Sequence, residues 1–428
     1  MIELLLLFFI LFFAYSFVVL VNLDVLYAGI YFFLFLYIIF VIIGYTYVPI
    51  VSEIIKAYFG AHVILPLLLF VFGSFISFFI LTLLFYSKFK KNCSFDLIHV
   101  KFPFGRILFF SLVTAHTTFL FAYFFTHYQE LNYSSLANED YQSSGGVSFV
   151  LFVLCFKYLP PLLLLLYALK KKKVYTKNGP TKLNLVLLNF FFSFLLILFI
   201  GIANKVGNRT DILSFLIGLI IFEYSYFKEI LSRSFPYLKY LFLVIIVGAF
   251  MNYLKETRTQ HEILESIWYQ KLLLQDYYAP GHILIASINF DYVQPLEVIK
   301  SNLSNMLFRL GVPYLQTNIT EIFNPGVTTR SASYAYYIFT EGYMFMGYFG
   351  FLYNGIAVFL GVSLWRSISL STNSSYNLFM LALVSERMAT CVRSQTSFFI
   401  KDFYMIYIPF IFLYGLQTGL FPKVKIFK

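Results

Sequence analysis

Long, almost uninterrupted apolar stretches recur along the whole chain, and this feature constrains its fold more than any other. The run from Ile2 to Ile50, for example, is broken only around Asn22–Asp24. A helix that crosses a bilayer needs about 20 mostly apolar residues. By this criterion the 428-residue sequence predicts eleven spans, in a range of about 10–12, at 3–21, 25–44, 62–86, 105–127, 147–169, 183–203, 211–227, 240–253, 341–364, 376–395 and 403–421.

The composition indicates a chain whose solvent is mostly lipid. Hydrophobic residues make up 60% of it and charged residues only 12%, whereas soluble domains have about 45–50% and about 25%. Too little polar surface is available to cover a water-soluble globule, which excludes a soluble enzyme, a disordered chain and a coiled coil. We therefore predict an all-α, polytopic integral membrane protein.

The positions of the basic residues predict the orientation of the spans. One set of alternate loops holds 18 of the 31 Lys and Arg residues, at 88–106, 170–182, 228–239, Arg366 and 423–428. The other set holds 9 basic and 12 acidic residues, at 45–61, 128–146, 204–211 and 254–335. Basic residues gather in cytoplasmic loops. The net charge of +11 therefore reports topology rather than nucleic-acid binding, and the C-terminus is expected in the cytoplasm.

One long outer loop divides the chain into three parts. An N-terminal bundle of about eight spans is expected at 1–253, the loop at 254–335, and Arg-bearing C-terminal spans at 336–428. Loops without structure rarely exceed about 12–15 residues. Two segments of this loop have the spacing of amphipathic helices, near 262–276 and from Pro295 to Leu310. Such helices would lie on the outer leaflet or cap the bundle.

The sequence carries no signature of metal, disulfide or nucleotide chemistry. Its three cysteines, Cys93, Cys155 and Cys391, are far apart, its six histidines are scattered, and HExxH, GxxxxGK[ST] and GxSxG motifs are absent. We therefore expect no cofactor and no metal site. Ionisable residues within the spans are the remaining candidates, because charge in a bilayer is costly and is retained mainly for function.

The segment after the long loop concentrates polar residues. If it is helical from about Arg330, then Arg330, Tyr334, Tyr337, Glu341 and Tyr348 share one stripe. That stripe would suit a polar substrate whose head lies at the outer leaflet. The alternative is a polar stripe that hydrogen-bonds to neighbouring helices.

The predicted span 376–395 contains Glu386, Arg387 and Arg393. Two arginines in one span are typical of an anion site, because a guanidinium binds two phosphate oxygens at once. The alternative is a structural ion pair of Glu386 with Arg393, seven residues further along the same helix face, or with another helix.

Other ionisable residues have weaker signals. Lys157 and Glu223 would form a buried pair or reach the cytoplasmic surface. Five residues of the long loop could line a substrate cleft, although a loop histidine is more often simply solvated: Arg258, His261, His282, Asp291 and Arg309.

The layout resembles the Wzy-type O-antigen (oligosaccharide repeat-unit) polymerases of bacterial inner membranes. The parallels are the many spans, the large periplasmic loop late in the chain and the segment Glu341-x-Tyr343-x3-Gly347-x2-Gly350. This segment is similar to the family's E-x-Y-x-x-F/M-G-x-x-G pattern. The arginines of the next span also fit. An arginine followed by ten residues and a glycine, which some members have in the periplasmic loop, is not found at Arg258, Arg309 or Arg330.

The resemblance implies a metal-independent membrane glycosyltransferase. It would polymerise undecaprenyl-diphosphate-linked repeat units of O-antigen, or of a similar surface polysaccharide, at the periplasmic face of the inner membrane. The implied catalytic residues are Glu341, Arg330, Arg387 and Arg393. The implied substrate-binding residues are Arg258, Arg309, His282, Tyr334, Tyr337 and Tyr343. The lipid-linked oligosaccharide and membrane lipid are the expected partners, a chain-length regulator is compatible with this role, and nucleic acid is not expected.

Two other membrane functions stay open at this point. A lipid-linked oligosaccharide flippase would also be polytopic and lined with arginines, but such flippases tend to have short loops and even numbers of spans. An O-antigen ligase would share the late periplasmic loop and the arginines, and its acceptor would be lipid A–core.

Overall fold

The computed structural model describes residues 2–47, 63–92, 96–129, 131, 146–176, 182–206, 209–232, 234, 279–306 and 337–423. The chain forms two compact units. Unit 1 comprises Met1–Cys93, Glu262–Ser367 and Met388–Phe403, and unit 2 comprises Ser94–His261, Ile368–Arg387 and Tyr404–Lys428.

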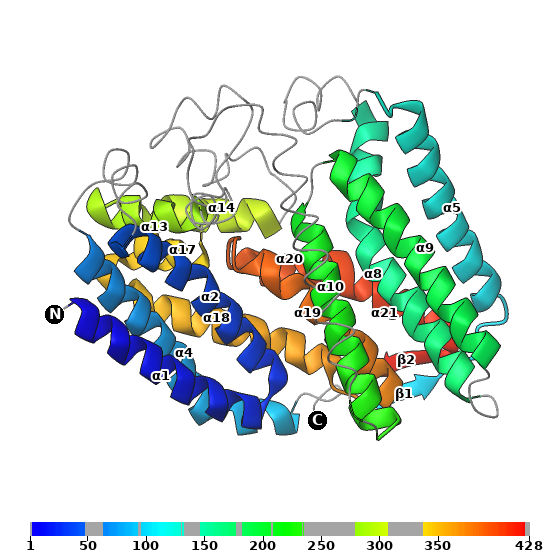
Figure 1. Cartoon of the computed structure of the whole chain (residues 1–428), viewed down its shortest axis with the longest axis horizontal. Helices are drawn as coiled ribbons and strands as arrows, with labels where there is room; N and C mark the ends of the chain where they lie inside the picture. The colour runs from blue at the N-terminus through cyan, green and yellow to red at the C-terminus, as the bar shows by residue number, and fades with distance from the viewer. Residues whose placement is uncertain are drawn as a thin grey trace. The chain divides into compact units, whose positions relative to one another are not determined.

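Unit 1 is built around three long N-terminal helices that pack on one another (Figure 1): α1 (Ile2–Leu23), α2 (Val25–Tyr47) and α4 (Ile64–Asn92). Aromatic side chains fill their interfaces, and Phe13 stacks on Phe35 with ring centroids 3.6 Å apart. The later elements of this unit are α13 (Ala279–Asn289), α14 (Pro295–Met306), α17 (Ile338–Met346), the 3-10 turn η2 (Gly347–Phe349), α18 (Gly350–Ser369) and α20 (Ser397–Asp402).

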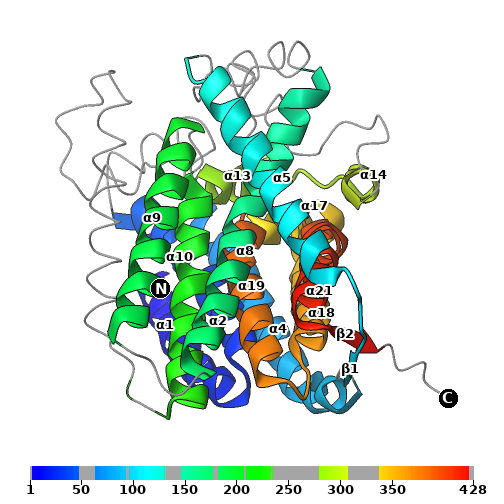
Figure 2. The same cartoon turned by 90° about the vertical axis from the view of Figure 1, so that its right-hand side faces the viewer.

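Unit 2 is a second helical bundle (Figure 2). Its elements are β1 (Asp96–His99), α5 (Gly105–Thr126), α8 (Gly146–Thr176), α9 (Lys182–Val206), α10 (Arg209–Ser225), the π-helices η1 (Tyr226–Ile230) and η3 (Phe403–Tyr407), α21 (Ile408–Thr418) and β2 (Leu420–Lys423). Helix α19 (Ser374–Cys391) belongs to this unit as far as Arg387. Buried Phe152, Phe199 and Phe215 lie in the core shared by α8, α9 and α10.

Seven helical segments in the described part of the chain are long and apolar enough to cross a membrane. They are Ile2–Leu23, Val25–Gly44, Ile64–Lys88, Gly105–Thr126, Val147–Val174, Ile338–Ser369 and Ser397–Thr418. The predicted all-α membrane character is thus confirmed, because a bilayer leaves backbone groups no partner outside a helix or a closed barrel. The predicted spans 183–203 and 211–227 are also helical, as α9 and as α10 with η1, and the predicted span 376–395 is helical as far as Cys391, in α19. The predicted span 240–253 lies outside the described residues, and the count of eleven stays a prediction.

A buried carboxylate joins several helix ends at one end of unit 1. Asp24, between α1 and α2, accepts hydrogen bonds from Leu26 N (2.9 Å) and from the Tyr86 hydroxyl (3.1 Å) near the end of α4. The same carboxylate pairs with Nε of Arg366, near the end of α18, at 2.5 Å. Three helix ends that lie in different parts of the sequence are therefore fastened together by one carboxylate.

Unit 2 has one small β-structure, which the all-α prediction did not include. Strands β1 and β2 pair antiparallel, with Asp96 opposite Lys423 and His99 opposite Leu420 (Figure 2). The loop after α4 and the segment after α21 therefore lie on the same side, as the distribution of basic residues predicts.

The predicted helical stripe from Arg330 to Tyr348 is wrong in its described part. Tyr337 has an extended backbone (φ −67°, ψ 136°) and precedes α17. The helix is then interrupted by η2, where Gly347 has φ +58°. Beyond this break the Gly350 backbone packs directly on that of Gly342, although eight residues of unbroken helix would separate them by about 12 Å. Tyr348 therefore cannot extend the face that carries Glu341.

This sharp turn makes a strong prediction about Gly350. A Cβ at this position would lie 1.9 Å from the Gly342 carbonyl oxygen, so Gly350→Ala forces the two backbones apart. We expect a loss of about 1–3 kcal/mol or more of unfolding free energy. Thermal unfolding of the detergent-solubilised protein measures it, and Gly201→Ala in α9 is the matched control, because a Cβ there meets nothing within 4 Å. Equal midpoints for the two variants would contradict this description of the turn.

Candidate functional site

The most strongly organised polar group in unit 1 is the carboxylate of Glu341, in the first turn of α17. Its side chain is fully buried. Oε1 accepts hydrogen bonds from Asn302 Nδ2 (2.6 Å), the Tyr353 hydroxyl (2.5 Å) and the Thr396 hydroxyl (2.5 Å), and Oε2 accepts one from Thr396 N (2.8 Å). These donors come from α14, α18 and the segment between α19 and α20. Three separate parts of the chain therefore converge on Glu341.

Local structure explains why Glu341 occupies this position. The Ile338 N–H, at the start of α17, donates to the Val392 carbonyl (3.1 Å), just after α19 ends. This bond holds the α17 N-terminus beside the segment that contains Thr396. A carboxylate in the first turn also complements the partial positive charge of a helix N-terminus.

The buried face of α14 makes further polar contacts next to Glu341. Gln395 Nε2 donates to Ser301 Oγ (2.5 Å), and Asn305 Nδ2 donates to Ser397 Oγ (2.7 Å). Lys401 Nζ then donates to Asn305 Oδ1 (2.8 Å). Together with Asn302 and Glu341, these bonds fix α14 to α17 and α20 through polar contacts.

The turn between α13 and α14 is fastened by two phenols. Tyr343 of α17 donates to Asp291 Oδ1 (2.9 Å), and Asp291 has a left-handed backbone (φ 48°). Tyr292 donates to Glu297 Oε2 (3.0 Å), and burial together with this carboxylate raises the pKa of Tyr292 to about 12. Tyr292 therefore stays a neutral donor at physiological pH.

Two cations lie on the chain segment that Glu341 holds. Arg393 is half-buried in the turn after α19, three residues before Thr396, and Lys401 is half-buried in α20. Asn302 Oδ1, buried beside the Glu341 carboxylate, has no hydrogen-bond partner among the described residues. This part of unit 1 thus combines two cationic side chains with buried polar groups.

The described tyrosines of the predicted site, Tyr337 and Tyr343, make contacts that stabilise the fold. Tyr337 is buried, donates to the Leu34 carbonyl (3.0 Å) and stacks on Tyr37 at 5.2 Å between ring centroids. Tyr343, also buried, bonds Asp291 as described above. Their geometry favours a structural role over contact with substrate.

Several predicted site residues fall where their side chains are not described. Arg258, Arg309, Arg330, Tyr334 and the candidate loop residue His261 lie outside the described residues, as does the predicted helix 262–276. His282 lies in α13, but its side chain is outside the described part.

Arg387 and Arg393 are separated by the end of α19. The helix stops at Cys391, so the prediction that Glu386 and Arg393 share a helix face is wrong. Instead Glu386 and its neighbour Arg387 form a buried pair in unit 2, with Nε and Oε2 3.4 Å apart. The Glu386 side chain also packs close to Gly218 of α10. Arg387 therefore belongs to unit 2, whereas Glu341 belongs to unit 1.

A second buried ion pair lies in unit 2 and was missed by sequence reasoning. Glu223 pairs with Lys171, not Lys157, and it also accepts a bond from the Tyr167 hydroxyl (2.6 Å). Both charged side chains are at most 3% exposed. The Lys171 ammonium lies 4.8–5.8 Å from the centroids of four aromatic rings, those of Tyr167, Phe222, Tyr226 and Phe227. Such rings stabilise a cation that is out of reach of water.

The described residues hold no cluster of three potential metal ligands.

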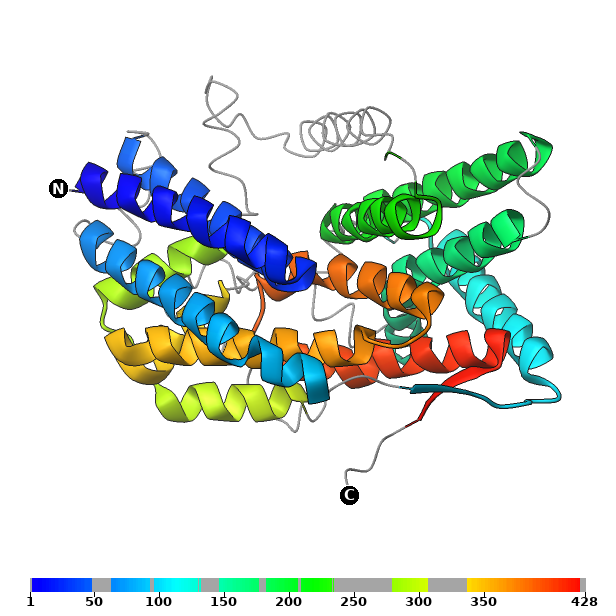
Figure 3. The ribbon, with the colours of Figure 1, turned by 90° about the horizontal axis from the view of Figure 1, so that it is seen from below.

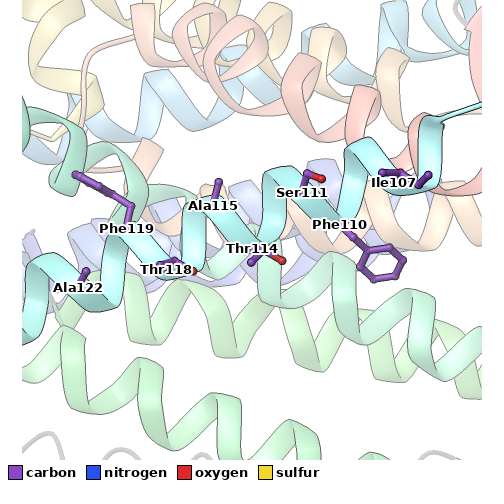
Figure 4. A pocket seen from close by; sticks show the side chains of 8 residues that line it. All are labelled: Ile107, Phe110, Ser111, Thr114, Ala115, Thr118, Phe119 and Ala122. Atoms are coloured by element: carbon purple, nitrogen blue, oxygen red, sulfur yellow. The ribbon is translucent and has the colours of Figure 1, made fainter.

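A shallow hollow runs along the surface of α5, lined by Ile107, Phe110, Ser111, Thr114, Ala115, Thr118, Phe119 and Ala122 (Figure 4). All of these residues belong to one helix and none is charged. The hollow therefore lacks the chemistry of a catalytic site, and the Glu341 region remains the candidate.

Comparison with known proteins gives no relative: no protein-family model, no curated protein and no solved structure matches the chain.

Proposed function

We propose that this membrane protein transfers a glycan between lipid-linked oligosaccharides, as an O-antigen polymerase of the bacterial inner membrane. The donor is a growing glycan on undecaprenyl diphosphate, and the acceptor is a hydroxyl on the sugar of one lipid-linked repeat unit. Two observations support this proposal: the Glu341–Gly350 segment resembles the pattern of the Wzy-type polymerases, and the side chains around it have suitable chemistry.

One observation carries the proposal. A fully buried carboxylate, Glu341, organises the segment that bears Arg393 and Lys401, in a chain with several apolar helices long enough to cross a bilayer. Buried polar networks in membrane proteins are expensive and commonly mark function. A site for a lipid diphosphate needs fixed cations next to the bilayer, and this segment supplies two.

The reaction assigns different roles to these groups. The acceptor hydroxyl attacks the anomeric carbon of the donor, the bond from that carbon to the diphosphate oxygen breaks, and the lipid diphosphate leaves with the electron pair. Positive charge from Arg393, and from Lys401 nearby in the sequence, would stabilise the leaving group. The acceptor proton passes to a base.

Glu341 fits the role of a positioning residue better than that of the base. Its four donors occupy about as many lone-pair positions as a carboxylate has. Oε1 accepts three of these bonds and Oε2 accepts one, so the buried carboxylate is engaged mainly in holding its neighbours in place. The catalytic roles of Arg330 and Arg387 stay predictions.

Replacement of Arg393 tests the proposed leaving-group site. In a strain that lacks the gene, Arg393→Gln is expected to lower glycan transfer by about 100-fold or more, so that lipopolysaccharide carries a single repeat instead of a ladder. Silver-stained gels of extracted lipopolysaccharide measure this, with the amount of membrane-inserted protein checked in parallel. Arg106→Gln, at an exposed arginine of α5, is the matched control and should restore the ladder. A full ladder from Arg393→Gln would remove Arg393 from the mechanism.

The deletion strain also separates the two alternatives. Loss of a flippase leaves repeat units on the cytoplasmic face of the membrane, and loss of a ligase leaves long polymer on the carrier lipid. Loss of a polymerase leaves single repeats on the periplasmic face and on lipid A–core, which is the expected result.

A further inference from the structure

Helix α14 is inverted relative to an amphipathic helix in water. Its exposed face is apolar, with Leu296 62%, Ile299 45% and Leu303 52% exposed. Its buried face is mainly polar and consists of Val298, Ser301, Ser304 and Asn305, each at most 2% exposed. The sequence predicted an amphipathic helix from Pro295, and the structure turns its Ser301 and Ser304 inward.

The inward polar face has partners on its own side. Ser301 and Asn305 are bonded to Gln395, Ser397 and Lys401, and neighbouring Asn302 is bonded to Glu341. Water is therefore not needed to satisfy it. The outward apolar face, by contrast, gains nothing from water, because exposed apolar surface is unfavourable there and favourable in hydrocarbon. The arrangement is the one expected of a helix whose surroundings are less polar than its protein neighbours.

Unit 1 also exposes an apolar surface along α18, a helix that belongs to a candidate membrane span. Helix α14 packs on α17 and α20 at the edge of unit 1, as Figures 2 and 3 show. In η2, which follows α17, Phe349 is 70% exposed. It leads into α18, whose exposed residues Leu352, Ile356 and Leu360 recur every four positions along one side of an apolar span. Exposed Lys300 lies on the same side of α14, where its flexible chain can carry the charge to a lipid phosphate.

We infer that α14 is immersed in the bilayer, and that its Leu296–Ile299–Leu303 face contacts the acyl chains of membrane phospholipids. Residues 295–306, expected within the outer loop either on the outer leaflet or as a cap on the bundle, then belong to the membrane domain. This holds whether or not the protein is a glycosyltransferase. If the proposed function is also correct, α14 lies between the acyl chains of a lipid-borne substrate and the polar region around Glu341.

Spin-label accessibility tests this inference. The full-length protein, freed of native cysteines by Cys93→Ser, Cys155→Ala and Cys391→Ala, receives a nitroxide label at Leu303→Cys and is reconstituted in phosphatidylethanolamine–phosphatidylglycerol vesicles. Collisions with oxygen, which concentrates in the bilayer, are compared with collisions with a water-soluble nickel chelate. Leu352→Cys on α18 is the reference for lipid contact, and Val298→Cys on the inner face of α14 is the matched control for burial.

The expected result is a ratio of oxygen to nickel collisions at position 303 that equals the ratio at 352, with low values for both reagents at 298. High nickel accessibility at 303 would mean that α14 faces water. Low accessibility to both reagents at 303 would mean that another part of the chain, or a second copy, covers this face. Either of these two results overturns the inference.

Discussion

Replacing Glu341 with glutamine is expected to unfold the polar region of unit 1 locally and to abolish glycan transfer. Glutamine offers one acceptor oxygen where the carboxylate has two, so Thr396 N or the three donors on Oε1 lose a partner. Hydrogen bonds to charged groups contribute about 1.5–3 kcal/mol each. We expect a loss of about 3 kcal/mol or more in stability, together with lipopolysaccharide that carries single repeats.

Thermal unfolding in detergent and complementation of the deletion strain measure the two effects separately. Glu3→Gln, at an exposed carboxylate of α1, is the matched control and should leave both unchanged. A Glu341→Gln protein with normal stability but no ladder would mean that Glu341 takes part directly in the chemistry. Normal stability with a full ladder would contradict both roles.

Replacing Lys171 with methionine is expected to destabilise unit 2 by about 3–5 kcal/mol, the usual cost of leaving one partner of a buried ion pair alone. Glu223 would then remain buried beside the neutral Tyr167 hydroxyl without its cationic partner. The double variant Lys171→Met/Glu223→Gln should recover most of the loss, because it removes the unpaired charge. Lys173→Met, at an exposed lysine of the same run, should change stability by about 0.5 kcal/mol or less.

The unfolding midpoints of the wild type, Lys171→Met, Glu223→Gln and the double variant complete a double-mutant cycle for the pair. Lys173→Met is the control outside this cycle. If Lys171→Met behaves like Lys173→Met, or if the double variant is as unstable as Lys171→Met, the ion pair does not stabilise unit 2 and the description of its interior is wrong.

The positions of the spans could be predicted from the sequence because they depend on a local property. About 20 consecutive apolar residues have few ways to satisfy their backbone in lipid other than a helix. The start of α14 was equally readable, since Pro295 fits the first turn of a helix. The pairing of β1 with β2 agrees with the charge pattern, which depends only on where basic residues stand.

The site itself could be predicted only in part, because its geometry depends on contacts between distant segments. Glu341 was found as an acid in an apolar span, but its partners Asn302, Tyr353 and Thr396 carry no local signal. The turn at Gly347 depends on the packing of Gly342 on Gly350 rather than on either residue alone.

The burial of Lys171 could not be predicted from the sequence. It lies in a run of four lysines that reports topology, and nothing in the run distinguishes the one that is buried among aromatic rings from the exposed Lys170 and Lys173. Which face of α14 is turned toward the protein was equally hard to predict. An amphipathic pattern defines two faces of a helix but does not show which of them packs on the protein.

Reconstitution of the purified protein is the most direct test of glycosyl transfer. Liposomes that contain the full-length protein and one synthetic undecaprenyl-diphosphate-linked repeat unit, accessible on both faces, are incubated without nucleotide sugars and with a metal chelator. Products are separated by mass, and free undecaprenyl diphosphate is quantified. We predict chains of two or more repeats, with one undecaprenyl diphosphate released for each new linkage. Repeat units that stay single while the protein is folded and inserted would contradict the proposed polymerase activity.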